Sequence, residues 1–354
     1  MDNLIPETDF EKIVKAFNED FSFLRSKTIL VTGGTGLVGR YLLSFLTFIE
    51  EHYRLNLQVI ALGRSQSKFA HLLPDVSEKP EVRFIEQDIQ KSITVDNKLD
   101  FIIHLASNAS PALCAAEPIS TELTCIIGTN NLLALASRNP GCRFLMASSG
   151  DVYGSPSASG MRFKESDFGS VDCASLHSVY SEGKRAAETL CHAYQQEKKV
   201  DFVIARLCRI FGPTLSDSDN KGISEFIRNA AKKEPLVLKS SGLQTYSYMY
   251  VGDIVAALLF LLKNGCSGET YNLANNSVLL SLKELALFIS SQTGVPLSLL
   301  AQETQNKPSG YSSFSGSILD TSKIESLGFC PLFDIKPSLL VTVSLITKEL
   351  EKKN

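Results

Sequence analysis

The stretch Thr28-Ile-Leu-Val-Thr-Gly-Gly-Thr-Gly-Leu-Val-Gly39 decides the fold class of this chain. An apolar, β-rich run enters a cluster of glycines, and a helical pattern of apolar residues leaves it between Leu37 and Leu46. This order of strand, glycine turn and helix is typical of a unit that holds a dinucleotide pyrophosphate. Glycines permit a tight turn and close approach to phosphate, and the helix N-terminus adds free N–H groups and partial positive charge.

Two glycine spacings fit this turn. Gly34, Gly36 and Gly39 match G-x-G-x-x-G, while Gly33, Gly36 and Gly39 match G-x-x-G-x-x-G. A glycine-rich turn without a ligand is the alternative, but the strand and helix that the motif requires are both present. We therefore expect cofactor contacts from Gly33, Thr35, Gly36, Leu37, Val38 and Gly39.

The composition excludes several classes of protein. The 354 residues are 44% hydrophobic and 21% charged, as in a soluble globular protein of about two domains. The net charge of -3 gives no sign of a nucleic-acid surface, and no apolar run is long enough for a membrane span. The eight cysteines are scattered, without a C-x-x-C pair, and the five histidines lack ligand spacing. We expect a cytoplasmic protein without disulfides or a metal site.

Strand and helix patterns alternate over much of the chain. Strands are predicted at 57–62, 82–86, 101–105, 142–147, 201–205 and 269–274, and long helices at 119–138 and 178–197. This alternation predicts an α/β fold: a Rossmann-type doubly wound parallel sheet with a smaller α+β substrate lobe. We assign residues 28–211 plus 246–274 to the dinucleotide-binding domain, and 212–245 plus 275–345 to the substrate lobe.

Residues 1–27 form a separate N-terminal helical extension. Six apolar residues recur there at helical spacing: Phe10, Ile13, Val14, Phe17, Phe21 and Leu24. Thr8 and Glu11 fit a capping box. We favour a helix packed on the domain surface over a helix that binds a partner.

Tyr180 and Lys184 lie four residues apart in a helical pattern, so both side chains share one face. A free tyrosine has a pKa of about 10, and a nearby ammonium together with an oxidised nicotinamide would lower it to suit a general base. The Y-x-x-x-K pattern alone is common on surface helices. Its position gives it meaning, because the predicted strand before it ends in the hydroxyls of Ser148 and Ser149, at the sheet edge where ligands bind.

With these motifs, the chain resembles the extended short-chain dehydrogenases/reductases that modify nucleotide sugars, over about residues 27–345. The resemblance rests on Thr32–Gly39, Gln87-Asp-Ile89, His104-Leu-Ala106, Ser148-Ser-Gly-Asp-Val-Tyr-Gly154, Tyr180–Lys184, Arg206 with Phe211-Gly-Pro213, and Tyr250-Val-Gly-Asp-Ile254. Within this family the chain is most similar to UDP-glucuronate decarboxylases and dTDP-glucose 4,6-dehydratases.

The resemblance implies a role for individual residues. Ser149 would bind the reacting sugar oxygen, Tyr180 would be the base, and Lys184 would lower its pKa and bind the nicotinamide ribose. Further cofactor contacts are implied at Asp88, Ile89, Leu105, Ala106 and Ser107. Asp151 stands where these enzymes carry a catalytic glutamate, although a strand-end cap is the alternative. A dehydratase also needs an acid one residue earlier, where this chain has Gly150, so 4,6-dehydration is disfavoured.

The substrate half departs from the family pattern. Tyr246 replaces the arginine that grips the substrate diphosphate, and Arg209 replaces an asparagine on the substrate side. Further changes fall at Cys114, Leu123 and Cys125. An unusual sugar or nucleotide is therefore expected, with Ser110, Ser149, Arg209 and Tyr246 as substrate contacts. Arg209 could supply the missing positive charge, because guanidinium pairs bidentately with phosphate.

The second predicted strand lacks the terminal acid that NAD binding favours for its ribose diol. Arg64 and Ser65 follow it, with Lys68 nearby, and could hold a 2′-phosphate. We therefore favour NADP, while stacking of Arg64 on adenine would leave NAD possible.

The leading hypothesis is a nucleotide-sugar enzyme that oxidises the sugar at C4 and then epimerises, decarboxylates or dehydrates it. An NADPH-dependent reductase of a keto-sugar or other carbonyl is one alternative, and a non-catalytic NAD(P)-sensing binding protein is another. We expect a homodimer, as the resemblance implies, through the helices at 119–138 and 178–197. These carry apolar residues beyond one sheet-facing stripe, namely Ile126, Ile127, Leu132, Leu133, Ala186, Ala187 and Leu190.

Overall fold

The computed structural model describes residues 4–156, 160–299 and 316–353. Its main layer is a seven-stranded sheet in the order β3-β2-β1-β4-β5-β7-β11, in which every neighbouring pair is parallel. The strands are β1 (Thr28–Thr32), β2 (Gln58–Gly63), β3 (Val82–Glu86), β4 (Phe101–His104), β5 (Arg143–Ser149), β7 (Asp201–Leu207) and β11 (Glu269–Leu273). The predicted doubly wound parallel sheet is confirmed, and each strand begins and ends within two residues of the expected range.

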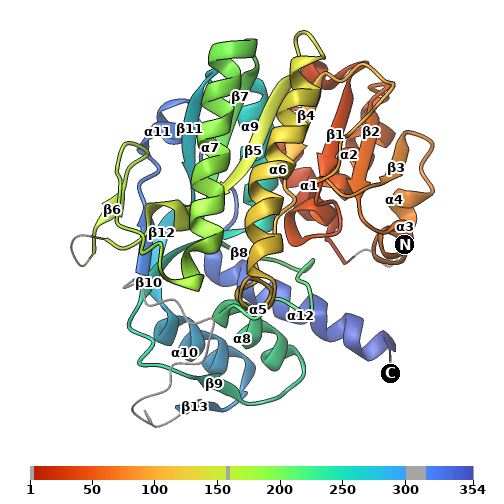
Figure 1. Ribbon diagram of the computed structural model, residues 1–354. Coiled ribbons are helices and arrows are strands. Elements are labelled where there is room, and N and C mark those ends of the chain that lie inside the picture. Colours follow the sequence, from red (N-terminus) through yellow and green to blue (C-terminus); the bar gives the residue numbers. More distant parts are fainter. Residues whose placement is uncertain (1–3, 157–159, 300–315, 354) are drawn as a thin grey trace.

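Helices cover both faces of this sheet (Figure 1). Alternate residues of β1 face opposite cores, with Leu30 on the side of α6 (Pro118–Ser137) and α7 (Val179–Lys198). Ile29 and Val31 face the core shared with α2 (Leu37–Tyr53) and α9 (Val251–Asn264). Burial on both faces explains why β1 reads as an almost continuous apolar run. Short helices α3 (Gln66–Leu72) and α4 (Pro74–Ser77) lead from β2 to β3, and α5 (Pro111–Ala116) precedes α6.

The N-terminal extension packs on the sheet-covering helices, as expected. Helix α1 (Glu7–Ala16) is followed by the 3₁₀ turn η1 (Ser22–Leu24). The Phe10 ring lies 5.5 Å from the rings of both Tyr41 and Phe45. Asp9 Oδ2 accepts hydrogen bonds from the hydroxyls of Tyr41 (3.3 Å) and Tyr250 (2.6 Å). The predicted capping box is wrong, because α1 begins at Glu7 directly after Pro6 and Thr8 lies inside the first turn.

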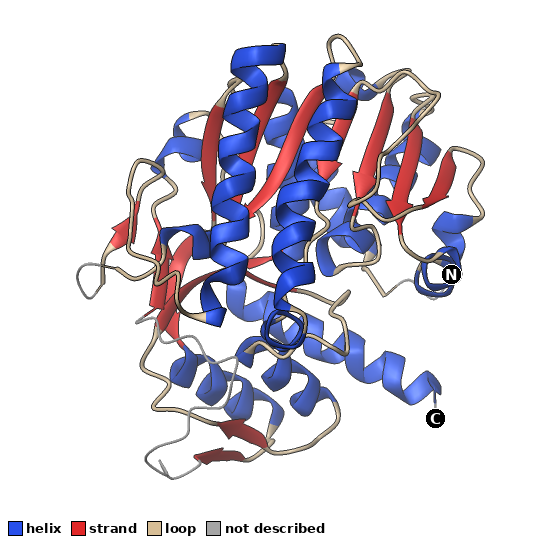
Figure 2. Ribbon diagram, viewed as in Figure 1, coloured by secondary structure: helices blue, strands red, loops and turns tan. Residues whose placement is uncertain are grey.

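A smaller lobe lies below the carboxyl edge of the sheet (Figures 1 and 2). Its sheet has the order β12-β10-β14-β6, with β8 beside β10, and β9 pairs with β13. The strands are β6 (Arg162–Phe163), β8 (Arg209–Phe211), β9 (Leu236–Leu238), β10 (Thr245–Tyr250), β12 (Asn275–Ser281), β13 (Leu297–Leu299) and β14 (Gly316–Leu319). The helices are α8 (Gly222–Ala231), α10 (Leu282–Thr293), α11 (Ser322–Ser326) and α12 (Ile335–Lys353).

The lobe boundaries from the sequence stay a prediction. The structure places β8 and β10 in the smaller sheet, although both were assigned almost entirely to the dinucleotide-binding domain. Residues 300–315 of the predicted lobe lie outside the described residues. Within the described ranges, no helix is both long and apolar enough to cross a membrane.

Candidate active site

The glycine turn after β1 requires glycine at two positions. Gly33 has φ +74°, and a Cβ there would lie 2.7 Å from the backbone nitrogen of Ala106. A Cβ at Gly39 would collide with the carbonyl oxygen of Gly33. Helix α2 begins at Leu37, so its first N–H groups lack intrahelical acceptors and are available to an anion. Backbone amides, tight approach and a helix N-terminus together fit a dinucleotide pyrophosphate.

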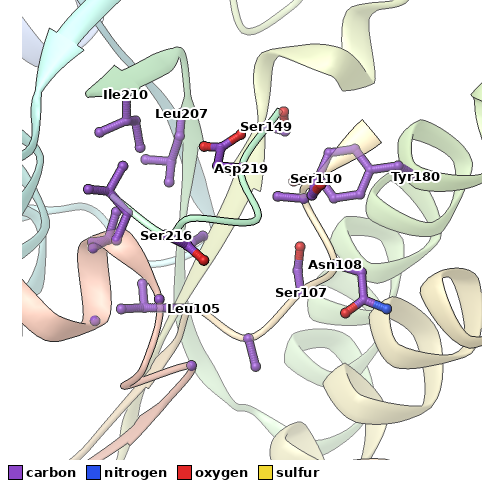
Figure 3. Close-up of a pocket in the computed structure, with 18 of the residues that line it drawn as sticks. Leu105, Ser107, Asn108, Ser110, Ser149, Tyr180, Leu207, Ile210, Ser216 and Asp219 are labelled. Atoms are coloured by element: carbon purple, nitrogen blue, oxygen red, sulfur yellow. The ribbon is translucent and has the colours of Figure 1, made fainter. Parts of the chain in front are cut away.

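A cavity of about 420 Å³ opens beside this turn, between the carboxyl edge of the large sheet and the smaller lobe. Figure 3 shows Ser149 and Tyr180 on one side of it, with Leu207 and Ile210 on another. Of the predicted site residues, the cavity is lined by Gly33, Thr35, Gly36, Leu37, Val38, Gly39, Arg64, Asp88, Ile89, Leu105, Ala106, Ser107, Ser110, Ser149, Asp151, Tyr180, Lys184, Arg209 and Tyr246. The fold thus gathers residues from eight segments of the chain around one space.

Ser65 is the exception among the predicted cofactor contacts. It does not line the cavity; its hydroxyl instead accepts a hydrogen bond from the backbone N–H of Lys68 (3.2 Å) and caps α3. A helix start needs such an acceptor, which explains why serine stands there. Arg64 and Lys68 are exposed and do line the cavity.

A buried chain of polar side chains supports the floor of the cavity. His104 contacts Thr32 Oγ1 through Nδ1 (2.8 Å) and Thr129 Oγ1 through Nε2 (3.2 Å). The Thr32 hydroxyl also accepts a hydrogen bond from the backbone N–H of Ala106 (3.2 Å). Burial lowers the pKa of His104 to about 3, with a smaller effect from Lys184, so the ring is neutral near pH 7. This chain fixes the loop at Ala106 against the glycine turn.

Tyr180 and Lys184 lie on the face of α7 that meets the end of β5. Lys184 Nζ donates a hydrogen bond to the carbonyl oxygen of Ala147 (2.6 Å) and lies 5.9 Å from the centre of the Tyr180 ring. In the absence of cofactor, burial raises the pKa of Tyr180 well above its usual value, and Asp151 raises it further. Hydrogen bonds from Ser107 and Ser149 oppose this rise. The sequence-based expectation of a lowered pKa, which includes a bound oxidised nicotinamide, stays a prediction.

Lys184 is itself almost fully buried, at 2% exposure. Burial lowers the pKa of its ammonium, while Cys125, Glu188 and Cys191 oppose that change. A bound oxidised nicotinamide is therefore the missing positive charge that would favour the Tyr180 phenolate.

The turn after β5 carries one carboxylate into the cavity. Ser149 Oγ accepts a hydrogen bond from the backbone N–H of Asp151 (3.2 Å) at the start of the 3₁₀ turn η2 (Gly150–Tyr153). Asp151 is exposed and lines the cavity. A Cβ at Gly150 would lie 3.2 Å from Leu319 Cδ2, so this position has little room for an acidic side chain.

Arg209 places a guanidinium on the wall that the smaller lobe contributes. It lies 3.9 Å from the centre of the Tyr246 ring, a cation–π contact across β8 and β10. Burial lowers the pKa of Arg209, but Tyr246 and Asp151 outweigh burial and hold it above its usual value. Within the described ranges, no carboxylate lies within ion-pair distance of Arg209.

Sequence reasoning missed several other residues of the smaller lobe that line the cavity. These are mainly Ser216, Ser218, Asp219, Lys221, Ser247 and Ser317. The loop that carries the first four bends over α5, where Asn220 Oδ1 accepts hydrogen bonds from Ser110 Oγ (3.1 Å) and the N–H of Ala112 (3.3 Å). The polar character of residues 214–222 was the available signal, although it indicated only a loop.

Fold and site together define an extended short-chain dehydrogenase/reductase. The sequence model of the NAD dependent epimerase/dehydratase family matches residues 29–274, and the chain belongs to that family of enzymes. The glycine cradle and the free amides of α2 fit the NAD(P) cofactor that this family uses.

Similar proteins agree with this assignment. The chain is 32% identical to "UDP-glucuronic acid decarboxylase 1" of Xenopus tropicalis over 329 residues, which are 92% of this chain and 73% of that protein. It is 35% identical to "UDP-glucuronic acid decarboxylase 1" of Arabidopsis thaliana over 247 residues, which are 70% of this chain but only 54% of that protein. A dTDP-glucose 4,6-dehydratase of Bacillus anthracis, crystallised with NAD, has the same fold (TM-score 0.76, 21% identity, covering 92% of this chain and 98% of that one).

Proposed function

We propose that this protein oxidises the sugar of a nucleotide sugar at C4 and then uses the resulting ketone to alter a neighbouring carbon. The observation that carries the proposal is the meeting of Ser149, Tyr180 and Lys184 in one cavity with the glycine turn. Parallel sheets of this order bind ligands outside the carboxyl ends of their strands, which is where these residues lie.

The residues divide the oxidation between them. Ser149 donates a hydrogen bond to the C4 oxygen, and the Tyr180 phenolate takes the proton from the C4 hydroxyl. Lys184, held by the carbonyl of Ala147, stabilises the phenolate by its charge. The glycine turn at residues 33–39 would hold the cofactor, and an oxidised nicotinamide bound there would supply the acceptor for the C4 hydride. Residues of the smaller lobe, among them Tyr246 and Ser317, line the cavity opposite the large sheet.

The turn after β5 selects among the reactions of the ketone. Elimination needs an acid beside the base, and position 150 is a glycine with Leu319 packed close to it. Asp151 is the single carboxylate at this turn and serves epimerisation or decarboxylation. Because the curated relatives are UDP-glucuronic acid decarboxylases, UDP-glucuronic acid is the first substrate to test.

Arg209 is the proposed contact to an anionic group of the substrate. Its guanidinium lines the cavity, stacks on Tyr246 and lacks a carboxylate partner in the part of the chain that the structure describes. A partly buried cation without an anionic partner is costly, so a substrate phosphate or carboxylate would stabilise it. Arg209 would thus take over the role of the family's diphosphate-binding arginine, whose position in this chain is occupied by Tyr246.

Arg64 and Lys68 support a preference for NADP over NAD. Both are exposed cations on the cavity wall after β2, while that strand ends without a carboxylate. A 2′-phosphate would pair with them, whereas a ribose diol gains most from an acid. The eight free cysteines suit the reducing cytoplasm, where we place the protein.

A homodimer through α6 and α7 completes the proposal. Three of the residues expected at the interface are buried within the protomer, so the prediction is wrong for them: Leu132, Leu133 and Ala187. Ile126, Ile127, Ala186 and Leu190 remain half-buried. Large apolar side chains are also exposed near the start of both helices: Ile119 (75%), Leu123 (38%) and Leu176 (67%).

The function is tested with purified protein, UDP-glucuronic acid and NAD or NADP. We expect CO₂ or an epimerised sugar, with the cofactor returned to its oxidised form. Consumption of one NADPH for each sugar would instead identify the reductase. Bound cofactor without turnover of UDP-glucuronic acid, UDP-glucose or dTDP-glucose would contradict the proposal and favour a binding protein.

A further inference from the structure

We infer that Glu188 is a positioning residue for Tyr180 and Lys184, because its carboxylate sets the register between α7 and the end of β5. This inference rests on the proposed roles of Tyr180 and Ser149. Tyr180, Lys184 and Glu188 are spaced by four residues each, so they form one stripe of α7 that faces the sheet.

Glu188 is held by donors from two neighbouring strands. Its Oε1 accepts hydrogen bonds from Ser148 Oγ of β5 (2.5 Å) and Arg206 Nε of β7 (3.0 Å), and its Oε2 accepts one from Arg206 Nη2 (2.7 Å). Ser148 and Arg206 are register partners in the sheet, so their side chains point to the same face. A single carboxylate therefore binds α7 to both strands at once.

Three consecutive residues of β5 meet this stripe. The carbonyl of Ala147 accepts a hydrogen bond from the Lys184 ammonium, the hydroxyl of Ser148 donates to Glu188, and Ser149 lines the cavity together with Tyr180. A shift of α7 along β5 would break the first two contacts together and move Tyr180 relative to Ser149. Small displacements in such sites have large effects on rate, which gives the Glu188 contact a functional consequence.

The contact is buried and fully satisfied. Glu188 is 8% exposed and Arg206 is 9% exposed. Removing one member of a buried ion pair strands the other and strongly destabilises a protein, whereas neutral replacement of both members is better tolerated. The test therefore uses Ser148→Ala, which leaves the ion pair intact, and the double variant Glu188→Gln/Arg206→Gln, which leaves the net charge unchanged.

The readout is the ionisation of Tyr180 with NAD or NADP bound, whichever the protein holds more tightly. Phenolate absorbance is titrated against pH, and each protein is referred to its own Tyr180→Phe version so that other tyrosines cancel. Both variants retain the other titratable groups around Tyr180 and Lys184, which are Asp151, Cys125, Cys191 and His104, and Ser148→Ala also retains Glu188. This titration needs no sugar, so its outcome is separate from the outcome of the substrate test.

We expect both variants to raise the apparent pKa of Tyr180 by about one unit, since the ammonium of Lys184 is held less closely to the phenolate. With an active substrate, kcat should fall on the order of tenfold, with KM nearly unchanged. Asp201→Asn is the matched control, because Asp201 pairs with Arg143 at the far end of the same two strands (2.8 Å). It should reduce stability without moving the titration.

An unchanged Tyr180 titration in both variants, with a loss of stability like that of Asp201→Asn, would overturn the inference. Glu188 would then hold the fold together and have no specific effect on Tyr180.

Discussion

The pKa of Tyr180 depends on residues from several parts of the fold and not only on its neighbours in α7. Burial raises the pKa of its phenol, and Asp151 adds to that rise. Lys184 cannot offset this alone, since burial also lowers the pKa of its ammonium. The proposed role of Tyr180 as the base therefore requires a further positive charge beside its phenol, which a bound oxidised nicotinamide would supply.

Tyr180→Phe should keep the fold and the bound cofactor but remove turnover. General acid–base groups typically contribute about 10²–10⁴-fold to rate, so a loss of that order is expected in steady-state assays. Tyr194→Phe is the control on the same helix, because its hydroxyl bonds Asn130 Oδ1 (2.9 Å) away from the cavity. A phenylalanine variant at 180 with near-native rate would show that another group is the base.

Arg64→Asp should weaken NADP binding and leave NAD binding equal or stronger. The new carboxylate repels a 2′-phosphate and accepts hydrogen bonds from a ribose diol. Dissociation constants from calorimetry measure both cofactors. Arg83→Asp controls for charge alone, since Arg83 is exposed on the edge strand β3. Equal loss of both cofactors would instead assign Arg64 to adenine stacking or structure.

Sequence was a good guide to residues whose partners are close along the chain. The glycine turn, the Tyr180–Lys184 pair and the β5 terminus each form a local motif, and all of them reach the cavity. Ser317 and Ser247 were not predicted, because they reach it through pairing of β10 with β14, which are about 70 residues apart and share no sequence signal. Ser65 caps α3, and its cofactor contact stays a prediction, because a helix cap and a phosphate contact favour the same residue type.

At the scale of elements, both the positive φ and the close approach of Ala106 require glycine at position 33 of the turn. Gly33→Ala should abolish dinucleotide binding and destabilise the fold, since it adds a collision with Ala106 to an unfavourable positive φ. Gly294→Ala separates the two effects: φ is similar at +72°, but no atom lies within 4 Å of the added Cβ. We expect a loss of about 1 kcal/mol there, with cofactor binding intact. If Gly33→Ala and Gly294→Ala lost the same stability and bound the cofactor equally well, the collision with Ala106 would not be what requires glycine at position 33.

The start of α9 predicts a dependence of stability on pH. Burial raises the pKa of Asp253 to about 7, although its carboxylate accepts hydrogen bonds from the backbone N–H groups of Leu332 (2.5 Å) and Phe333 (3.2 Å). Asp9, whose pKa is also raised by burial, adds to this rise. The folded state therefore binds more protons than the unfolded state between about pH 4 and pH 7.

The contribution of Asp253 to stability is thus fully present at low pH and lost as pH rises through about 7. The change is on the order of 4 kcal/mol for a shift of this size. Urea unfolding of the wild type and Asp253→Asn at several pH values measures it. We expect the difference between the two proteins to vary over this range, and a constant difference would show that Asp253 does not titrate there.

At the scale of the whole molecule, the outward face of α6 and α7 predicts the state of assembly. Exposed Ile119, Leu123 and Leu176 lie near the start of these helices, and apolar surface of this kind usually marks an interface. Stable dimer interfaces commonly bury on the order of 2,000 Å² or more. Light scattering should give twice the 38.7 kDa of one chain, and Ile119→Lys/Leu176→Lys should shift it toward the monomer. A dilution-stable monomer of wild-type protein would refute the dimer.

The match to the family begins at residue 29, but the body that folds begins earlier. Helix α1 covers Tyr41 and Phe45 of α2. Asp9 accepts hydrogen bonds from the hydroxyls of Tyr41 in α2 and Tyr250 in β10. The N-terminal helix thus connects α2, beside the large sheet, with β10 of the smaller sheet. The segment that matches the family model is therefore shorter than the segment that packs as one body.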